Sequence, residues 1–161
     1  MAMTPAIQAA IRGFNDIILR GVPILLEKNE TAFLSFMCSV AAIDALAGYR
    51  YTTGQERFKN FIKEYFPTAY ASHAEKLYFF RCRLLHNFTP AHFTVVHASP
   101  AHHLQPSPIG DTILSDDVFF ADLKAAALKF FDEVQKDVPN RQDAMNVRLL
   151  NLDKGGAIYY E

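Results

Sequence analysis

Tryptophan is absent from the 161 residues, and cysteine occurs only at Cys38 and Cys82. Two thiols cannot build a disulfide framework or a four-thiolate zinc site, and free thiols suit a reducing compartment. The first residues lack a basic stretch followed by a long apolar run, so we expect no secretory signal. The sequence therefore predicts a cytoplasmic protein whose two cysteines are small core residues.

Strong charge of one sign is also missing, because 16 Lys and Arg face 17 Asp and Glu. A strongly basic nucleic-acid binder is thus excluded at the level of the whole chain. The phosphate-binding loops GxxxxGK[ST] and GxGxxG do not occur, and no Ser lies in a nucleophile-elbow motif. These absences argue against the usual nucleotide loops and against an elbow-type Ser nucleophile.

Apolar residues, by contrast, make up 50% of the chain, and Phe alone occupies 14 positions. Such a chain builds a sizeable core, and its length fits one domain over residues 1–161. Apolar spacing predicts an all-α, up-down bundle of four or five helices. The expected helices cover residues 5–20, 31–47, 55–65, 69–88 and 115 to about 136, followed by a short one to about 151.

Helix breakers and β-branched residues mark the boundaries. Pro23 ends or kinks the first helix, and Gly48 is the expected residue just after the central helix. A small β-hairpin or meander is expected at about residues 92–114, before the last long helix, with Phe93–His97 as one strand. The tail at about 152–161 has no periodicity and is expected to be irregular.

The run Ala32–Tyr49 has 18 residues and a single charge, Asp44. A membrane-spanning helix needs about 20 mostly apolar residues. Because this run also carries serines, it is more simply the central helix of a soluble bundle. We therefore expect no membrane association.

A second charged residue in an apolar setting, besides Asp44, lies in the segment Leu77–Phe88. On a helix, Arg81 falls in a stripe otherwise built from apolar residues, where a guanidinium is costly unless it is paired or reaches a cleft. Asp44 is the obvious partner, because a carboxylate in an apolar helix also needs a cation. The alternative is that Asp44 lies at a bundle edge and meets water or a helix N-terminus.

His86 follows Arg81 by five residues, which places the two about 140° apart around the helix and about 7.5 Å along it. They can line one cleft or converge with copies from a second chain, and Arg83 is the nearer neighbour of His86. The alternative is that His86 only caps the end of the helix, where a cation is favourable.

No Asp or Glu occurs from Lys76 to Gly110, a span that carries three basic residues and five of the six histidines. This bias suits an anionic ligand such as phosphate. A neutral, solvated loop would have the same composition, because histidine carries little charge near pH 7. Three of the histidines, His97, His102 and His103, lack the spacing and partners of a zinc site. We therefore expect neither a metal nor a cofactor.

The motif Arg81-Cys-Arg-Leu-Leu-His86, followed by Asn87, resembles the Arg-x4–6-His motif of the HEPN superfamily. The members of that superfamily are small helical bundles. The apolar helix with one acidic residue before it is also similar, and the resemblance covers about residues 5–135. Many active members have a polar residue, commonly Asn, directly after the Arg. Cys82 stands there, a departure that bears on catalysis rather than on fold.

This resemblance implies a metal-independent endoribonuclease whose two motif helices meet across a homodimer. His86 would move the proton of the 2′-hydroxyl or of the leaving oxygen, and Arg81 would hold the scissile phosphate. Arg83 and Asn87 would contact phosphate or sugar, and Asp44 would orient Arg81. An antitoxin-like partner protein is implied as well. The alternative is a non-catalytic nucleotide-binding or protein-interaction module.

Overall fold

The computed structural model describes residues 2–52, 54 and 56–152. The chain is mostly helical with a small two-stranded sheet, as expected in outline. The main elements are α1 (Pro5–Phe14), α2 (Gly21–Leu25), α3 (Ala32–Tyr51), α4 (Arg57–Tyr65), α5 (Ala74–Asn87), β1 (Phe93–Val96), β2 (Thr112–Ser115), α6 (Asp116–Gln135) and α7 (Arg141–Leu152). Apart from residue 152, which ends α7, the expected irregular tail lies outside the described residues.

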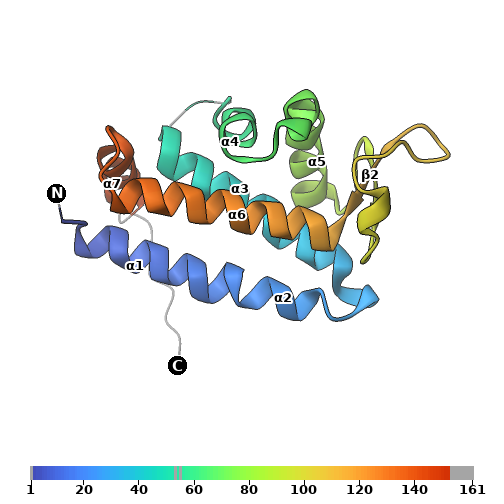
Figure 1. The fold of residues 1–161 in the computed structure, drawn as a ribbon, viewed down its shortest axis with the longest axis horizontal. Helices are drawn as coiled ribbons and strands as arrows, with labels where there is room; N and C mark the ends of the chain where they lie inside the picture. Colours follow the sequence, from blue (N-terminus) through green and yellow to red (C-terminus); the bar gives the residue numbers. More distant parts are fainter. Residues whose placement is uncertain (1, 53, 55, 153–161) are drawn as a thin grey trace.

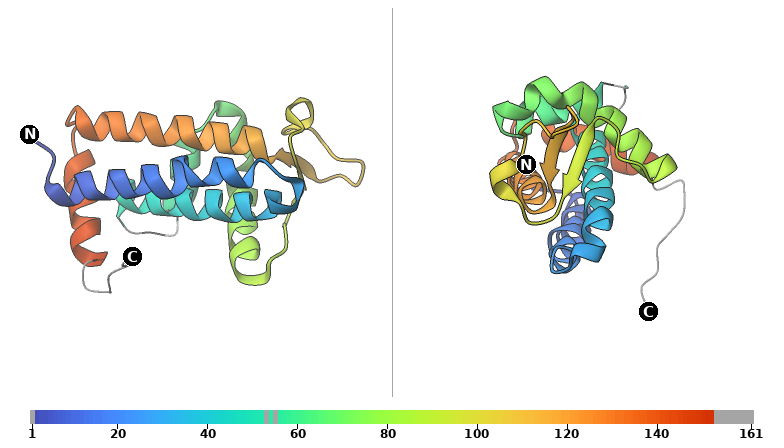
Figure 2. Two further views of the ribbon diagram at one scale, coloured as in Figure 1. Left: turned by 90° about the horizontal axis from the view of Figure 1, so that it is seen from below. Right: turned by 90° about the vertical axis from the view of Figure 1, so that its right-hand side faces the viewer.

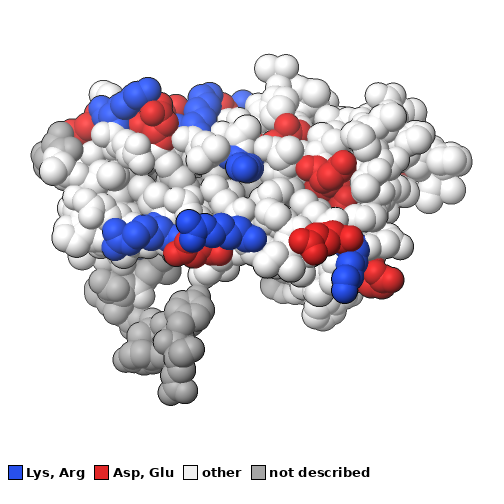
Figure 3. Space-filling model, turned by 60° about the horizontal axis from the view of Figure 1, so that its bottom comes forward, with Lys and Arg blue, Asp and Glu red and all other residues white. Residues whose placement is uncertain are grey.

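Three long helical layers run along the molecule: α1 with α2, α3, and α6 (Figure 1). The helices α4, α5 and α7 run across them, with α7 at one end and the small sheet at the other (Figures 1 and 2). The expected up-down bundle of four or five helices is therefore wrong in detail: the described residues form more helices, α1 to α7, and α3 and α6 run in the same direction, opposite to α1 (Figure 1). On the face shown in Figure 3, charged side chains of both signs are intermixed and separated by broad uncharged areas, in keeping with the balanced composition.

The first helix is divided rather than continuous. A π-turn at Asn15–Leu19 separates α1 from α2, and the backbone N–H of Arg20 donates to the Asn15 carbonyl at 3.0 Å. Pro23 has no N–H, and its ring would clash with the carbonyl of Leu19 in a regular helix. The wider turn before it is the local response to that clash.

α3 is the centre of the fold and contacts α2, α4, α5, α6 and α7. Together with the 3-10 turn before it, this helix (Asn29–Tyr51) is long and apolar enough to cross a membrane, but its position is that of a core helix of a soluble protein. The expectation that Gly48 follows the helix was wrong, because α3 continues to Tyr51. Gly48 instead allows close approach of α7, since a Cβ there would lie 3.1 Å from Arg148 Nε.

Phenylalanine rings tie the transverse helix α5 to the lengthwise core. Phe36 of α3 meets Phe80 of α5 edge to face at 5.9 Å and Phe119 of α6 at 5.7 Å, measured between ring centroids. Phe80 in turn meets Phe93 of β1 at 5.3 Å. All four side chains are buried. These contacts fix the rotation of α5 and hence which of its side chains face α3.

The hairpin prediction was wrong in its pairing, because β1 and β2 are parallel, with Phe93 opposite Thr112 and Val96 opposite Ser115. The chain between them turns back through a 3-10 turn at Pro100–His102 and re-enters in the original direction. The antiparallel contact that the sequence favoured forms next to β2 instead: the Ile113 N–H donates to the Gln105 carbonyl at 2.8 Å.

His103 anchors this insert to the helices. Its Nδ1 accepts the backbone N–H of Ser115 at 3.0 Å, so Nε2 carries the ring proton and faces the Tyr70 hydroxyl at 2.7 Å. The Tyr70 hydroxyl donates onward to Asp122 at 2.7 Å. Burial lowers the pKa of His103 and outweighs the opposing effect of the Asp122 and Asp117 carboxylates. The fold thus needs this histidine to be neutral.

We expect acid to destabilise the protein through His103. In the unfolded chain His103 takes up a proton near its ordinary pKa of about 6.5, before the folded protein does, so its stabilising contribution is present above that pH and lost below it. Urea unfolding at about pH 7.5 and about pH 5.5 should show a smaller loss of stability in His103→Gln than in wild type. His102→Gln, at an exposed neighbouring position, is the control and should keep the wild-type loss. An undiminished loss in His103→Gln would contradict this assignment.

Candidate anion-binding hollow

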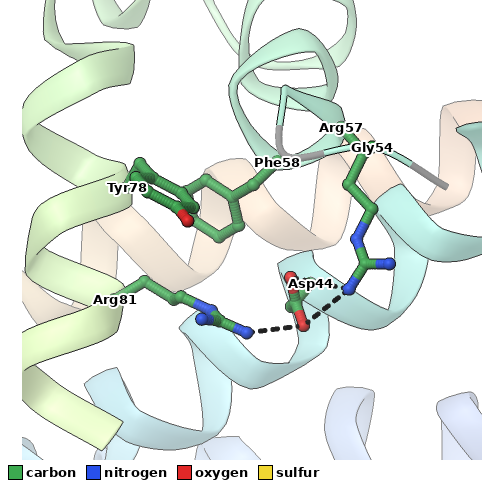
Figure 4. A pocket seen from close by; sticks show the side chains of 6 residues that line it. All are labelled: Asp44, Gly54, Arg57, Phe58, Tyr78 and Arg81. Atoms are coloured by element: carbon green, nitrogen blue, oxygen red, sulfur yellow. Dashed lines mark hydrogen bonds and ion pairs between the residues drawn. The ribbon is translucent and has the colours of Figure 1, made fainter. Parts of the chain in front are cut away.

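A hollow of about 350 Å³ opens where α3, α4 and α5 meet (Figure 4). Each helix contributes to it, and Tyr78 and Arg81 lie three residues apart on α5, which puts them on one face. The residues that line it are Asp44, Gly54, Arg57, Phe58, Tyr78 and Arg81.

The predicted pair of Arg81 and Asp44 is confirmed: Arg81 Nη2 lies 2.8 Å from Asp44 Oδ2. Arg81 follows the buried Ala74 and Leu77 along α5, and the turn of the helix carries it from the core to the rim. Its side chain is 21% exposed and that of Asp44 is 24% exposed, so the pair faces the hollow rather than the interior. Burial by itself lowers the pKa of Arg81, but the Asp44 carboxylate and the hydrogen bonds hold it above its ordinary value.

Arg57 is a site residue that sequence reasoning missed. Its Nη2 lies 3.4 Å from Asp44 Oδ2 and 3.5 Å from Oδ1, so one carboxylate is shared by guanidinium groups from α4 and α5 (Figure 4). In the sequence, Arg57 stands at the start of an amphipathic helix, where an exposed charge is ordinary. Only the unusual isolation of Asp44 hinted that one carboxylate would need more than one cation.

The hydrogen bonds of Arg81 are incomplete. Its Nε is buried without a partner, and the acceptor of Nη1 is the sulfur of Cys82 at 3.7 Å, a weak contact. The residue that departs from the HEPN pattern thus touches the motif arginine directly. With Asp44 between them, Arg57 and Arg81 leave one uncompensated positive charge in the hollow.

An aromatic wall borders these charges. Phe58 and Tyr78 meet with ring centroids 6.2 Å apart at an angle of 62°. Phe58 is buried and serves as packing, whereas Tyr78 is half-buried and turns its hydroxyl toward the hollow (Figure 4). A site that combines guanidinium groups with one open aromatic side suits a ligand that is anionic at one end and planar at the other.

The other predicted site residues do not line this hollow. Arg83, His86 and Asn87 are exposed on the last turns of α5, beyond Arg81. Phe88 then ends the helix in a left-handed conformation, with φ of 55°. A single chain therefore brings Arg81 and Asp44 together but leaves His86 outside, at the helix end where the alternative interpretation as a terminal cation also puts it.

The histidines of the insert are engaged in the fold. Across the described residues, no group of three or more His, Cys, Asp or Glu side chains has the arrangement of a metal site. The histidine contacts are His97 Nδ1 with Asp116 Oδ2 at 2.7 Å, His102 Nδ1 with Ser99 Oγ at 2.8 Å and His103 Nε2 with the Tyr70 hydroxyl at 2.7 Å. Each of them thus has a structural role.

The chain matches no protein-family model, no curated protein and no solved structure. Its function is therefore argued from the geometry of the site.

Asp44→Asn should destabilise the protein by about 1–2 kcal/mol, because two guanidinium groups lose their shared carboxylate. Partial exposure keeps the expected cost below that of a fully buried pair. Asp16→Asn is the matched control, since Asp16 forms an exposed pair with Arg20 at 2.8 Å, and should cost about 0–0.5 kcal/mol. Chemical denaturation measures both values, and equal effects of the two substitutions would count against a special role of Asp44.

Proposed function

We propose that this protein is a cytoplasmic, HEPN-like, metal-independent endoribonuclease in which Arg81 binds the scissile phosphate and His86 transfers protons. The observation that carries the proposal is the Arg81 guanidinium, which is fixed by Asp44 beside an open hollow and whose Nη1 has only a weak contact to the sulfur of Cys82. A structural arginine has no need of such an opening. A phosphate does, because its oxygens accept from a planar fork of N–H groups.

The chemistry requires no metal. The 2′-hydroxyl oxygen attacks the adjacent phosphorus as His86 accepts its proton, the P–O5′ bond breaks, and the leaving O5′ takes up the proton that His86 releases. The products are a 2′,3′-cyclic phosphate and a free 5′-hydroxyl. Arg81 stabilises the charge that develops on the non-bridging oxygens. The ordinary pKa of an imidazole, about 6.5, suits proton transfer near neutral pH. Arg83 and Asn87 supply further contacts to phosphate or sugar.

A homodimer completes the proposed site. Because His86 lies outside the hollow of its own chain, the imidazole that serves Arg81 comes from a second copy. Two exposed aromatic residues flank the motif on α5: Phe79 is 47% exposed and Phe88 is 67% exposed. Burying them against a second copy would favour association of the two helices. An antitoxin-like partner would block activity by covering the same surface.

A second candidate is a non-catalytic nucleotide-binding module, which could also serve protein interaction. The observation that favours it is that one chain already holds the complete hollow, with two guanidinium groups and an aromatic side, while His86 stands apart. In that case Asp44 and Arg81 orient a bound phosphate and no bond is broken.

The two candidates predict different results in a cleavage assay on single-stranded RNA with chelator present. The nuclease should cleave, and Arg81→Gln and His86→Gln should each lower the rate by about a hundredfold or more. Arg20→Gln and His102→Gln are matched controls at exposed positions and should cleave like wild type. Binding without cleavage by a folded wild-type protein would instead favour the nucleotide-binding module.

Mixing the two inactive variants tests whether the site is shared between chains. If Arg81 of one chain works with His86 of the other, a heterodimer of Arg81→Gln and His86→Gln keeps one intact site. An equimolar mixture should then recover about a quarter of the wild-type activity once subunits exchange. Absence of recovery, with exchange verified by labelled subunits, would refute the shared site.

A further inference from the structure

The hollow offers more hydrogen-bond donors than the protein uses. Asp44 takes one short bond from Arg81 and only long contacts, of 3.4 and 3.5 Å, from Arg57. Arg57 is 23% exposed and its contacts to Asp44 are long, so its guanidinium group is held less tightly than that of Arg81. Among the described residues, Arg81 Nη1 meets only the sulfur of Cys82 and Arg81 Nε has no partner.

A second charge cluster in the same protein shows the difference. Arg141 donates from Nε to Glu133 at 2.7 Å and from Nη2 to Glu64 at 3.1 Å, and Arg50 reaches Glu64 at 3.2 Å. In that cluster, two carboxylates pair with two guanidinium groups, and none of these residues lines the hollow. At Asp44 a single carboxylate answers two guanidinium groups beside an open volume. Balanced charges are typical of a cluster that stabilises the fold, whereas an excess of cations beside an open volume is typical of a binding site.

We propose that Arg57 is a second phosphate-binding residue, which together with Arg81 holds a nucleotide phosphate in the hollow while Tyr78 borders the attached nucleoside. This inference rests on the proposed function in taking RNA as the ligand. Free mononucleotides share the same chemistry. The one uncompensated positive charge of the hollow matches the single negative charge of a phosphodiester, which favours a link within an RNA strand over a terminal phosphate.

The binding step follows from the contacts. An entering phosphate oxygen accepts from Arg57 in place of the long contacts of Arg57 to Asp44, while the short hydrogen bond that Arg81 donates to Asp44 keeps Arg81 in position. A second oxygen accepts from Arg81 Nη1 in place of its weak contact to the sulfur of Cys82. Asp44 thus positions the pair, and its negative charge keeps the hollow from holding a doubly charged anion as firmly as a diester.

The test measures binding separately from cleavage. The probe is a short, fluorescently labelled single-stranded RNA with 2′-O-methyl groups, which cannot be cleaved, and its dissociation constant is read by anisotropy over a range of salt concentrations. Adenosine monophosphate and inorganic phosphate serve as competitors. Arg57→Gln should weaken RNA binding by roughly tenfold or more and lower the salt slope by about 0.7, the value for one lost contact to a single strand.

Two further variants keep the result interpretable. Arg57→Lys retains the charge but loses the planar fork, so it should fold like wild type and still bind the RNA severalfold more weakly. Arg20→Gln removes the same charge at an exposed position outside the hollow and should bind like wild type. Wild-type affinity and salt slope in both Arg57 variants would overturn the inference, as would a wild-type protein that binds none of the three ligands.

The outcomes also separate this inference from the proposed function. If the RNA binds through Arg57 but is never cleaved in its unmodified form, the inference stands and the nuclease fails. If cleavage depends on Arg81 and His86 but not on Arg57, the nuclease stands and the inference fails. Binding of adenosine monophosphate alone, measured by calorimetry and weakened in Arg57→Gln, without RNA binding would support the phosphate site and identify the free nucleotide as its ligand, against the nuclease.

Discussion

The shared carboxylate of Asp44 is the interaction on which the site depends. It is a charge in the middle of an apolar helix, where an unpaired carboxylate is costly. Arg81 from α5 and Arg57 from α4 both approach it, so one side chain links three helices. Because two cations share one anion, the balance at this point of the fold stays positive. The same contact therefore helps to hold the helices together and leaves the hollow suited to a negative ligand.

The sequence revealed half of this arrangement. Asp44 and Arg81 could be paired in advance because each is a charged residue in an otherwise apolar stripe. A charge in such a position needs a partner of opposite sign. Arg57 lies among ordinary surface charges, and only the packing of α4 against α3 brings it to the same carboxylate. The place of His86 could be anticipated, because helix geometry put it about 140° from Arg81 and near the helix end. That Arg81 faces Asp44 depends on the rotation of α5, which is set by the contacts of Phe80 with Phe36 and Phe93.

Prediction of the fold succeeded where local periodicity determines structure. Most helices follow from apolar spacing, but the first one is interrupted at Asn15–Leu19, earlier than the break expected at Pro23. The pairing of the strands could not be read in the same way, because parallel strands need a connection whose path depends on non-local contacts. Here the Leu104 N–H bonds to the Ile113 carbonyl at 2.8 Å, and His103 accepts from Ser115, so the connection itself pairs with β2 and turns the chain back.

Under the proposed function, the two tasks of the Arg-x4–6-His motif, phosphate binding and proton transfer, fall to residues of different chains. Under that function, phosphate binding needs only Asp44, Arg57 and Arg81, which line one hollow in a single chain. Proton transfer, under the proposed function, needs His86 of another chain. The affinity of each chain for its ligand would then not depend on the protein concentration, whereas the cleavage rate per chain would rise with the fraction of chains in dimers. A partner that binds the exposed end of α5, around Phe88, would block cleavage by preventing the second chain from docking while leaving the hollow open to its ligand. Control of such an enzyme would act on assembly rather than on substrate affinity.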